Sequence, residues 1–258
     1  MRPVFEIRHV NFSYHTLQGE TPALSDITFN VNPGEFIAIV GPSGCGKSTL
    51  LNLMAGMLAP EAGQILLNGK PLNPENRLQI GYMLQQDYLL EWRTILKNVL
   101  LGLEIRRELS PESIRYAHRL LSQYGLEKFE SARPHELSGG MRQRAALVRT
   151  LVLKPELLLL DEPFSALDYQ TRLTAGNDIG GIIKEQKKTA ILVTHDLSEA
   201  VSLADRILIL SSRPARLRRI VSIDMPAGLS PMQRRGHDTF KDYFNLIWEE
   251  LHLENKTD

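Results

Sequence analysis

The stretch GPSGCGKST, residues 41–49, restricts the possible folds of this chain more than any other part of its 258 residues. Its glycines allow main-chain N–H groups to turn toward an anion, because no Cβ atom stands in the way. An apolar run, EFIAIV at 35–40, comes before the loop, and the apolar run LLNLMAGML at 50–58 follows it. A buried strand, a glycine-rich loop and a helix in this order are typical of a phosphate-binding loop. The pattern therefore predicts an α/β nucleotide-binding fold.

Individual residues of the loop have expected roles. Lys47 can reach the β and γ phosphates of a nucleotide, and Ser48 can ligate Mg²⁺. The whole loop is expected to hold the phosphates, through Gly41, Pro42, Ser43, Gly44, Cys45, Gly46, Lys47, Ser48 and Thr49. Cys45 lies beside a helix N-terminus and a lysine, and both favour a thiolate. We therefore expect alkylation of Cys45 to block the site, and bound nucleotide to protect it.

Two carboxylates follow a second apolar run, LLLLDE, which ends at Asp161 and Glu162. In open α/β sheets, ligands bind at the carboxyl ends of the strands. Asp161 is predicted to hold Mg²⁺ through water, and Glu162 to polarise a water for attack on the γ-phosphate. The alternative is that Glu162 is only solvated at a strand end. The complete phosphate loop in the same chain favours the catalytic role.

Segments with strand and helix patterns alternate along the chain. Strands are expected at 4–14, 35–40, 80–86, 156–163 and 189–196, and a strand followed by a turn at 63–72. Between 87 and 136 the pattern is helical, and Ser110-Pro111 is expected to start a helix that Gly125 ends. The alternation predicts a parallel sheet with helices on its faces. Asp196 and Glu199 are expected to form a capping box after the last of these strands.

A second anion site is predicted at residues 137–141, LSGGM. Ser138 can cap the helix that follows, and Gly139 and Gly140 leave N–H groups bare at its start. The alternative is a helix cap with a structural role alone. Two phosphate sites in a chain with one phosphate loop favour the functional interpretation.

These motifs, in this order, resemble the ATP-binding subunits of ABC transporters over residues 4 to about 215. The signature of those subunits is LSGGQ, and Met141 replaces the glutamine here. The resemblance implies a P-loop NTPase (RecA-like) core with a parallel sheet, an N-terminal antiparallel β subdomain and an inserted α-helical subdomain. It implies a single domain, in which 1–86 and 137–230 form the core and β subdomain, 87–136 the helical subdomain and 231–258 a C-terminal helical tail.

The resemblance also implies ATP and Mg²⁺ as cofactors and assigns residues to catalysis. Gln85 matches the glutamine that senses Mg²⁺ and the membrane partner, although Gln86 is adjacent and the match depends on counting from GYML. His195 in THD matches the switch histidine. Gln85 and His195 therefore join Lys47 and Glu162 as expected catalytic residues, and Gln85 joins Ser48 and Asp161 at the Mg²⁺ site.

Two further positions follow from the resemblance. SALD, residues 165–168, matches the D-loop of those subunits, and Asp168 is expected to help bind ATP. Tyr14 matches the aromatic residue that stacks on adenine, and Phe12 in the same segment is the alternative. The seven histidines show no metal-ligand spacing, so Mg²⁺ is the one metal expected.

The resemblance implies that two copies of the chain sandwich two ATP molecules, each between the phosphate loop of one copy and Ser138 and Gly140 of the other. Permease subunits in the membrane are expected to bind near Gln85, and a solute-binding protein to act indirectly. The chain would then lie at the cytoplasmic face of the membrane, as a peripheral subunit. Leu89, Leu90 and Trp92 lie in that region and are either core residues or partner contacts.

The segments LLEW and SSRPARL most resemble the nitrate/sulfonate/taurine importer group, which also includes carriers of thiamine precursors. An ABC exporter ATPase is the alternative, and a soluble ABC-type ATPase acting on nucleic acid is a weaker one. A formal net charge of zero argues against a nucleic-acid partner. The single cysteine favours a reducing compartment.

Two features near the C-terminal end are expected to have structural roles. An amphipathic stretch is expected to pack on its own domain, through Phe240, Phe244, Ile247, Trp248 and Leu251. A basic cluster is expected to be a solvated hairpin rather than a contact with anionic lipid, and consists of Arg213, Arg216, Arg218 and Arg219.

Overall fold

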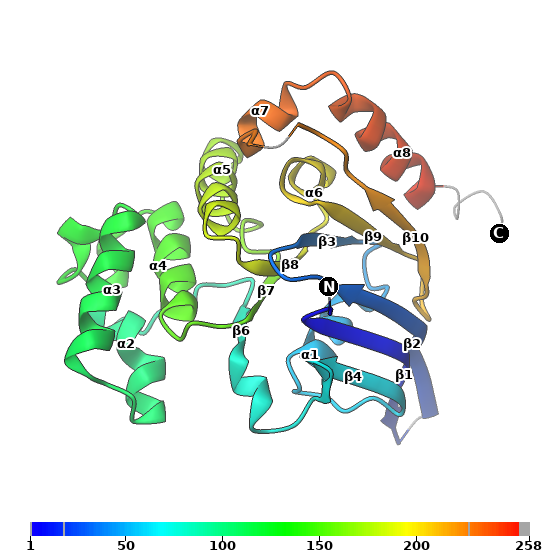
Figure 1. The fold of residues 1–258 in the computed structure, drawn as a ribbon, viewed down its shortest axis with the longest axis horizontal. Helices are drawn as coiled ribbons and strands as arrows, with labels where there is room; N and C mark the ends of the chain where they lie inside the picture. Colours follow the sequence, from blue (N-terminus) through cyan, green and yellow to red (C-terminus); the bar gives the residue numbers. More distant parts are fainter. Residues whose placement is uncertain (1, 18, 227, 253–258) are drawn as a thin grey trace.

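Two β-sheets meet at the centre of the computed structural model, which describes residues 2–17, 19–226 and 228–252 (Figure 1). The end of the predicted C-terminal tail, 253–258, lies outside the described residues. The first sheet is antiparallel, with the order β2 (Gly19–Val31), β1 (Phe5–Thr16), β4 (Ala62–Leu67) and β5 (Lys70–Pro71). The second has the order β10 (Leu217–Ser222), β9 (Arg206–Leu210), β3 (Phe36–Val40), β8 (Thr189–Val193), β7 (Leu157–Asp161) and β6 (Ile80–Met83).

The second sheet is the predicted parallel core. Strands β9, β3, β8, β7 and β6 run parallel, and β10 adds an antiparallel edge. Every residue of β3 and β8 is buried, because helices or the first sheet cover both faces. Alternate residues of β3 serve different cores: Ala38 faces the helices and Ile39 faces the antiparallel sheet.

Helices surround the core sheet (Figure 1). On one side lie α5 (Tyr169–Glu185) and α6 (Leu197–Leu203), with α7 (Pro231–Arg235) and α8 (Phe240–His252) beyond them. The other side carries α1 (Lys47–Met54), and beyond the β6 edge lie α2 (Ile95–Arg106), α3 (Pro111–Gln123) and α4 (Gly139–Leu151). Short 3-10 helices span Asn76–Gln79, Glu127–Phe129 and Pro134–Glu136. The predicted P-loop NTPase fold, with its antiparallel β subdomain and inserted helices, is confirmed.

Local signals explain where several helices begin and end. The Ser110 hydroxyl accepts a hydrogen bond from Ser113 N at 3.1 Å, and Pro111 begins α3, as predicted. The apolar run after the phosphate loop was expected to be helical to residue 58, but α1 ends at Met54. Gly56 has a φ of +68°, a left-handed conformation that ends a helix.

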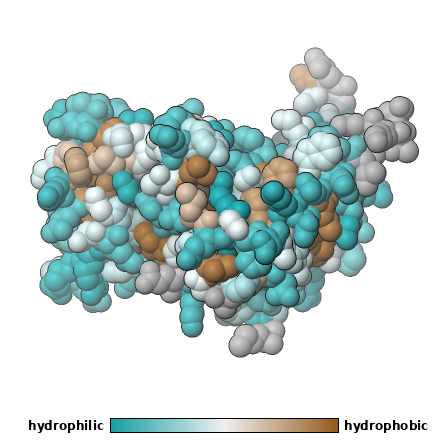
Figure 2. Space-filling view, turned by 90° about the horizontal axis from the view of Figure 1, so that it is seen from above, coloured by the Kyte–Doolittle hydropathy of each residue, from teal (hydrophilic) through white to brown (hydrophobic). Residues whose placement is uncertain are grey.

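The C-terminal helix packs on its own domain, as expected. Ile247 of α8 is buried in the core with α6, while Trp248 is partly exposed and stacks on His252. Figure 2 shows hydrophilic surface with separate hydrophobic patches on the face seen from above. Within the described ranges, the helices are all too short or too polar to cross a bilayer.

Candidate nucleotide site

A recess of about 320 Å³ opens where the phosphate loop meets the antiparallel sheet. It is lined by Tyr14, Ser43, Gly44, Gly46, Lys47, Ser48, Thr49, Glu162 and Arg213. The loop lies at the carboxyl end of β3, as a strand, loop and helix order predicts. The recess therefore contains most of the residues expected to hold phosphates, together with a catalytic candidate and one unexpected arginine.

The loop is held in shape by glycine geometry and by its own lysine. Gly46 has a φ of +123°, and a Cβ atom there would lie 3.0 Å from a Leu24 methyl carbon. The Lys47 ammonium donates hydrogen bonds to the carbonyl oxygens of Gly41 and Pro42, each at 2.8 Å. The lysine thus lies over the loop, where a phosphate can replace the carbonyls as its partner.

Cys45 lies in the phosphate loop just before α1, as expected, but its side chain is buried. Its side chain is 1% exposed and belongs to the core between the two sheets. A Cβ atom on Gly41 would lie 3.0 Å from the Cys45 sulfur, so the thiol fits under the loop. Burial of this thiol argues against direct access of an alkylating reagent in the folded protein.

Three predicted catalytic residues come together after β6, β7 and β8. The His195 Nδ1 atom lies 3.0 Å from the Glu162 carboxylate, and the Gln85 amide donates to the same carboxylate at 3.4 Å. Gln85 also donates to the Ser165 hydroxyl at 3.1 Å. Glu162 has a φ of +44°, a strained conformation for a glutamate. These bonds hold a carboxylate at the edge of the recess, where it can accept a proton.

Asp161 ends β7 beside Glu162 and has its own hydrogen-bond partner. The Tyr82 hydroxyl, on the adjacent strand β6, lies 3.3 Å from Asp161 Oδ2 and 3.4 Å from Asn52 Oδ1. Burial, with a smaller effect of the Glu162 charge, raises the pKa of Asp161, whereas the Tyr82 hydrogen bond lowers it. Tyr82 was not singled out in the sequence, because a tyrosine in a strand carries no motif.

The chemistry of the nearby donors fits Mg²⁺. The hydroxyl of Ser48, the carboxylate of Asp161 and the amide of Gln85 supply hard oxygen atoms, the ligands that Mg²⁺ prefers. Asp161 accepts one hydrogen bond from Tyr82 and keeps lone pairs for a cation or its water. A divalent ion would also offset the burial that raises the pKa of Asp161.

The second predicted anion site lies outside the recess. Ser138 caps α4 by accepting a hydrogen bond from Met141 N at 3.3 Å, and its side chain is exposed. Gly139 and Gly140 lack room for a side chain: a Cβ atom would meet Leu167 at 3.0 Å or Thr171 at 2.9 Å. Ser138 is therefore presented at the surface, and no residue of 137–141 lines the recess of its own chain.

Asp168 likewise stands at a helix start. It caps α5 by accepting a hydrogen bond from Thr171 N at 3.1 Å. Hydrogen bonding by the side chain of Thr171, and then by its main chain, lowers the pKa of Asp168. The residue is exposed and does not line the recess. Both the signature and Asp168 thus depend on something beyond this chain if they are to contact a nucleotide.

Tyr14 lines the recess, and Phe12 supports it. The two rings are T-shaped with centroids 5.0 Å apart, and the Tyr14 hydroxyl lies 3.0 Å from the Thr49 hydroxyl. The Arg213 guanidinium carbon lies 5.9 Å from the centroid of the Tyr14 ring. Arg213 was expected to belong to a solvated hairpin, and its position in the recess is a correction.

The rest of the basic cluster is engaged elsewhere. Arg218 and Arg219 pair with the Glu250 carboxylate of α8 at 3.2 Å and 2.6 Å. These ion pairs join β10 to the C-terminal helix. The expected solvated hairpin thus separates into one arginine at the recess, one exposed arginine, Arg216, and two bound to α8.

A capping box was expected at the start of α6, and only half of it forms. Asp196 Oδ1 accepts hydrogen bonds from Ser198 N and Glu199 N at 2.8 Å and 3.2 Å. The Glu199 carboxylate instead accepts from the Thr194 hydroxyl at 2.7 Å, and Thr194 Oγ1 accepts from Asp196 N at 3.0 Å. In a capping box the Glu199 carboxylate would accept from Asp196 N. Glu199 is buried instead, and the Thr194 hydroxyl accepts that hydrogen bond.

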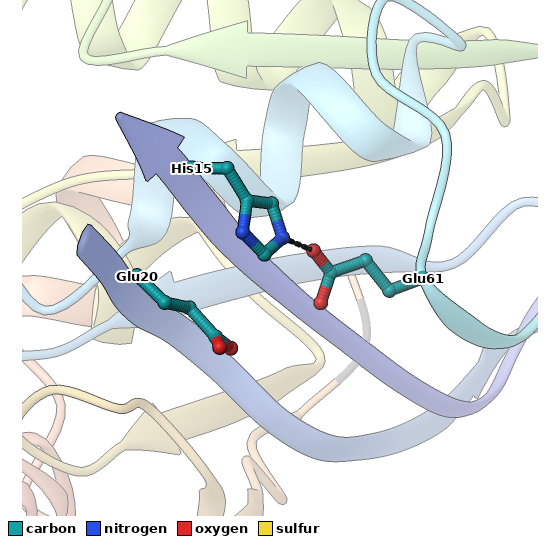
Figure 3. Close-up of side chains that lie close together, drawn as sticks. All are labelled: His15, Glu20 and Glu61. Carbon is teal, nitrogen blue, oxygen red and sulfur yellow. Dashed lines mark hydrogen bonds and ion pairs between the residues drawn. The ribbon is translucent and has the colours of Figure 1, made fainter. Parts of the chain in front are cut away.

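A cluster of ligand-type side chains lies on the antiparallel sheet, away from the recess lining (Figure 3). His15 Nε2 pairs with Glu61 at 2.5 Å, and Glu20 accepts from the Ser13 hydroxyl at 2.7 Å. Linear spacing did not reveal this cluster, because Glu61 lies far along the chain. All three side chains are exposed and already have partners, so we assign no ion to them.

Comparisons with known proteins agree with this geometry. A family model described as ABC transporter matches residues 24–165. The uncharacterized ABC transporter ATP-binding protein YtlC of Bacillus subtilis is 47% identical and spans 97% of this chain and 96% of its own. The taurine import ATP-binding protein TauB of Pelagibacter ubique is 40% identical, over 93% of this chain and 94% of its own.

A solved structure gives the same result for the fold. The dimeric ATP-binding cassette MJ0796, in a post-hydrolysis state with ADP and Pi, has a TM-score of 0.73 and 29% identity. The match covers 86% of this chain and 100% of that one. The family model, the relatives and the phosphate-loop geometry lead to one conclusion. The chain belongs to the ABC transporter family of ATP-binding proteins and is an ATPase.

Proposed function

We propose that the chain is the energy-coupling ATPase of an ABC importer for small solutes of the nitrate, sulfonate, taurine or thiamine-precursor type. The observation that carries the ATPase part is the Glu162 carboxylate, held at the recess by His195 and Gln85. The 40% identity to a taurine import protein supports the importer part.

We assign the nucleotide contacts as follows. The main chain of 41–49 surrounds the β and γ phosphates, with Lys47 as their charged partner. Tyr14 stacks on adenine, since its ring lines the same recess. Ser48, Asp161 and Gln85 would hold Mg²⁺, which when bound neutralises negative charge on the phosphates.

Hydrolysis in this proposal needs a water and a base. Glu162 accepts the proton of the attacking water, because its carboxylate lies at the recess edge beside Lys47 and Ser48. His195 holds Glu162 in place through the 3.0 Å contact, and a protonated ring there can stabilise charge on the γ-phosphate. Gln85 connects this carboxylate to the surface beyond β6, so a movement there can reposition the base.

We further propose that two copies close on two ATP molecules. The exposed Ser138 and the small Gly139 and Gly140 lie at the N-terminus of α4 but not at their own phosphate loop. A second copy can bring this helix N-terminus to the γ-phosphate of the first. Asp168 would contact the partner copy near the same nucleotide. The dimeric MJ0796 cassette supports this arrangement.

The proposed permease contact surrounds Gln85. Leu89 is buried and serves the core, whereas Trp92 is 73% exposed and Tyr88 is also exposed, so aromatic surface remains for a partner helix. We assign 87–136 as the helical subdomain that receives the permease, 1–86 and 137–230 as the core with its β subdomain, and 231–258 as the tail. The protein would then work at the cytoplasmic face of the membrane, with the solute-binding protein acting only through the permease.

The experiment that tests the ATPase mechanism is Glu162→Gln. The variant keeps the side-chain shape and removes the base, so we expect ATP to bind while turnover falls by roughly a hundredfold or more. The variant should also elute as an ATP-dependent dimer on a sizing column. Glu249→Gln, an exposed glutamate on α8, is the matched control. Normal turnover by Glu162→Gln would remove this residue from the mechanism.

The importer part has its own test. The chain is combined with its permease in vesicles, and uptake of radiolabelled taurine, an alkylsulfonate and nitrate is measured with ATP on the cytoplasmic side. ATP-dependent accumulation of one of these solutes, absent with Glu162→Gln, is expected. ATP-dependent movement in the opposite direction would overturn import and leave the ATPase assignment intact.

A further inference from the structure

The hairpin between β9 and β10 joins the two sheets beside the recess. Ala215 N donates to the Ala23 carbonyl at 2.9 Å, and Ser25 N donates to the Ala215 carbonyl at the same distance. A parallel bridge between Leu24 and Ala215 makes the hairpin a neighbour of β2. Arg213 stands two residues before this attachment, so its main chain is fixed relative to both sheets.

The Arg213 side chain is aimed by a second contact. Its Nε atom donates to the Pro22 carbonyl of β2 at 3.1 Å, and its guanidinium lies over the Tyr14 ring. The Tyr14 ring is itself held by its hydroxyl contact with Thr49 in α1. An aromatic ring and the guanidinium above it thus both line the recess.

We propose that Arg213 forms the second wall of the base-binding end, with the nucleotide base stacked between the Tyr14 ring and the Arg213 guanidinium. The inference rests on the nucleotide site described under the proposed function. Guanidinium planes stack on bases as aromatic rings do, and a cation adds attraction to the π-system. Tyr14 alone would cover one face of the base, and Arg213 would cover the other.

The observed separation is close to the one that this arrangement needs, and a small shift of Arg213 would open it. A base between two planar groups needs about 7 Å, since contacting carbon atoms lie about 3.5 Å apart. The present 5.9 Å between the guanidinium and the ring centroid is therefore about 1 Å too short. Arg213 is exposed and has a long side chain, so an outward shift of its guanidinium needs no movement of either sheet.

The position of Arg213 predicts which kinetic constant a substitution of this residue would change. The Arg213 guanidinium is paired with the ring assigned to adenine, while the reaction takes place at the γ-phosphate beside Glu162. A contact made equally in the ground state and the transition state changes KM rather than kcat. The same contact is available to ATP and ADP, because both carry the base.

The experiment compares Arg213→Ala, Arg213→Lys and the control Arg216→Ala, an exposed arginine of the same hairpin. ATP and ADP affinities are measured by isothermal titration, and KM and kcat from phosphate release. We expect Arg213→Ala to weaken the binding of ATP and of ADP by the same factor, about tenfold, as loss of one stacking contact with a base would. The effect should fall on KM, and binding of inorganic triphosphate should not change.

The lysine variant separates stacking from charge. Lysine keeps the positive charge but lacks the guanidinium plane. Arg213→Lys should therefore still bind ATP and ADP several-fold more weakly than the original protein does. Full recovery by lysine, or a larger loss for ATP than for ADP, would mean that the charge acts on the phosphates and would overturn the stacked arrangement. Unchanged affinity in Arg213→Ala would also overturn it.

The two proposals fail in different ways. If the original protein binds ATP and Glu162→Gln blocks turnover, while Arg213→Ala binds ATP normally, only the role of Arg213 is lost. If the original protein does not bind ATP, or Glu162→Gln turns over normally, the proposed function fails first. Circular dichroism of each variant verifies that the exposed substitutions leave the fold unchanged.

Discussion

Glu199 makes a quantitative prediction about stability and pH. The side chain is 4% exposed, and its carboxylate accepts a hydrogen bond from the Thr194 hydroxyl at 2.7 Å. The pKa of Glu199 is raised from 4.5 to about 7, mainly by burial and to a smaller extent by the nearby Asp196 charge. The Thr194 hydrogen bond and the charges of Arg172 and Arg235 lower it, but burial has the largest effect.

The direction in which the free energy of unfolding changes with pH depends on whether the folded or the unfolded chain holds the Glu199 proton. Above pH 4.5 the unfolded chain releases the Glu199 proton, while the folded chain keeps it until about pH 7. The contribution of the protonated Glu199 to the stability of the fold is therefore fully present below pH 4.5. It is lost as the pH rises from 4.5 through 7. A pKa difference of about 2.5 corresponds to about 3 kcal/mol in the free energy of unfolding.

The test is Glu199→Gln, which keeps the shape of the side chain and cannot ionise. The free energy of unfolding is measured from urea titrations at half-unit steps between pH 5 and pH 8. The free energy of unfolding of the variant, relative to that of the original protein, should rise by about 2–3 kcal/mol between pH 5 and pH 8. Glu249→Gln, at an exposed position, should follow the original protein throughout. Parallel pH curves for Glu199→Gln and the original protein would refute the reasoning.

Three further predictions concern the site. Tyr82→Phe removes the hydroxyl near Asp161, so Mg²⁺ should bind about tenfold more weakly in the presence of ATP, as measured by titrating Mg²⁺ in the ATPase assay. Unchanged Mg²⁺ dependence would show that this long hydrogen bond does not orient Asp161. Ser138→Arg should spare ATP binding by one chain and prevent the ATP-dependent dimer of a Glu162→Gln background on a sizing column; an intact dimer would contradict the proposed sandwich. Cys45, being buried, should react with a thiol reagent far more slowly in the native protein than in urea, and equal rates would contradict its position under the loop.

Features that depend on residues close together in the chain were predicted correctly from the sequence. The phosphate loop, the carboxylates after β7 and the cap at Ser110 are each short patterns with one geometric solution. These patterns sufficed to predict the parallel sheet and the position of the recess. The family resemblance then added His195 and Gln85, which do lie against Glu162.

Contacts between distant segments were not predictable in the same way. Arg213 looked like part of a solvated basic cluster, because its partner Tyr14 is about two hundred residues away in the chain. Glu199 looked like half of a capping box, and only burial of α6 sends its carboxylate to Thr194. The orientation of Cys45 depends on the core beneath the loop, which no local motif encodes.

The left-handed backbone at Glu162 has a consequence for how this position can vary. A glutamate with a φ of +44° is less stable by about 1 kcal/mol than a residue that tolerates this conformation, such as glycine or asparagine. Selection for stability alone would therefore replace Glu162, while the role proposed for it as the base requires the carboxylate. Under the proposed mechanism, thermal stability and activity make opposite demands on this position, so stabilised variants should keep Glu162 unchanged.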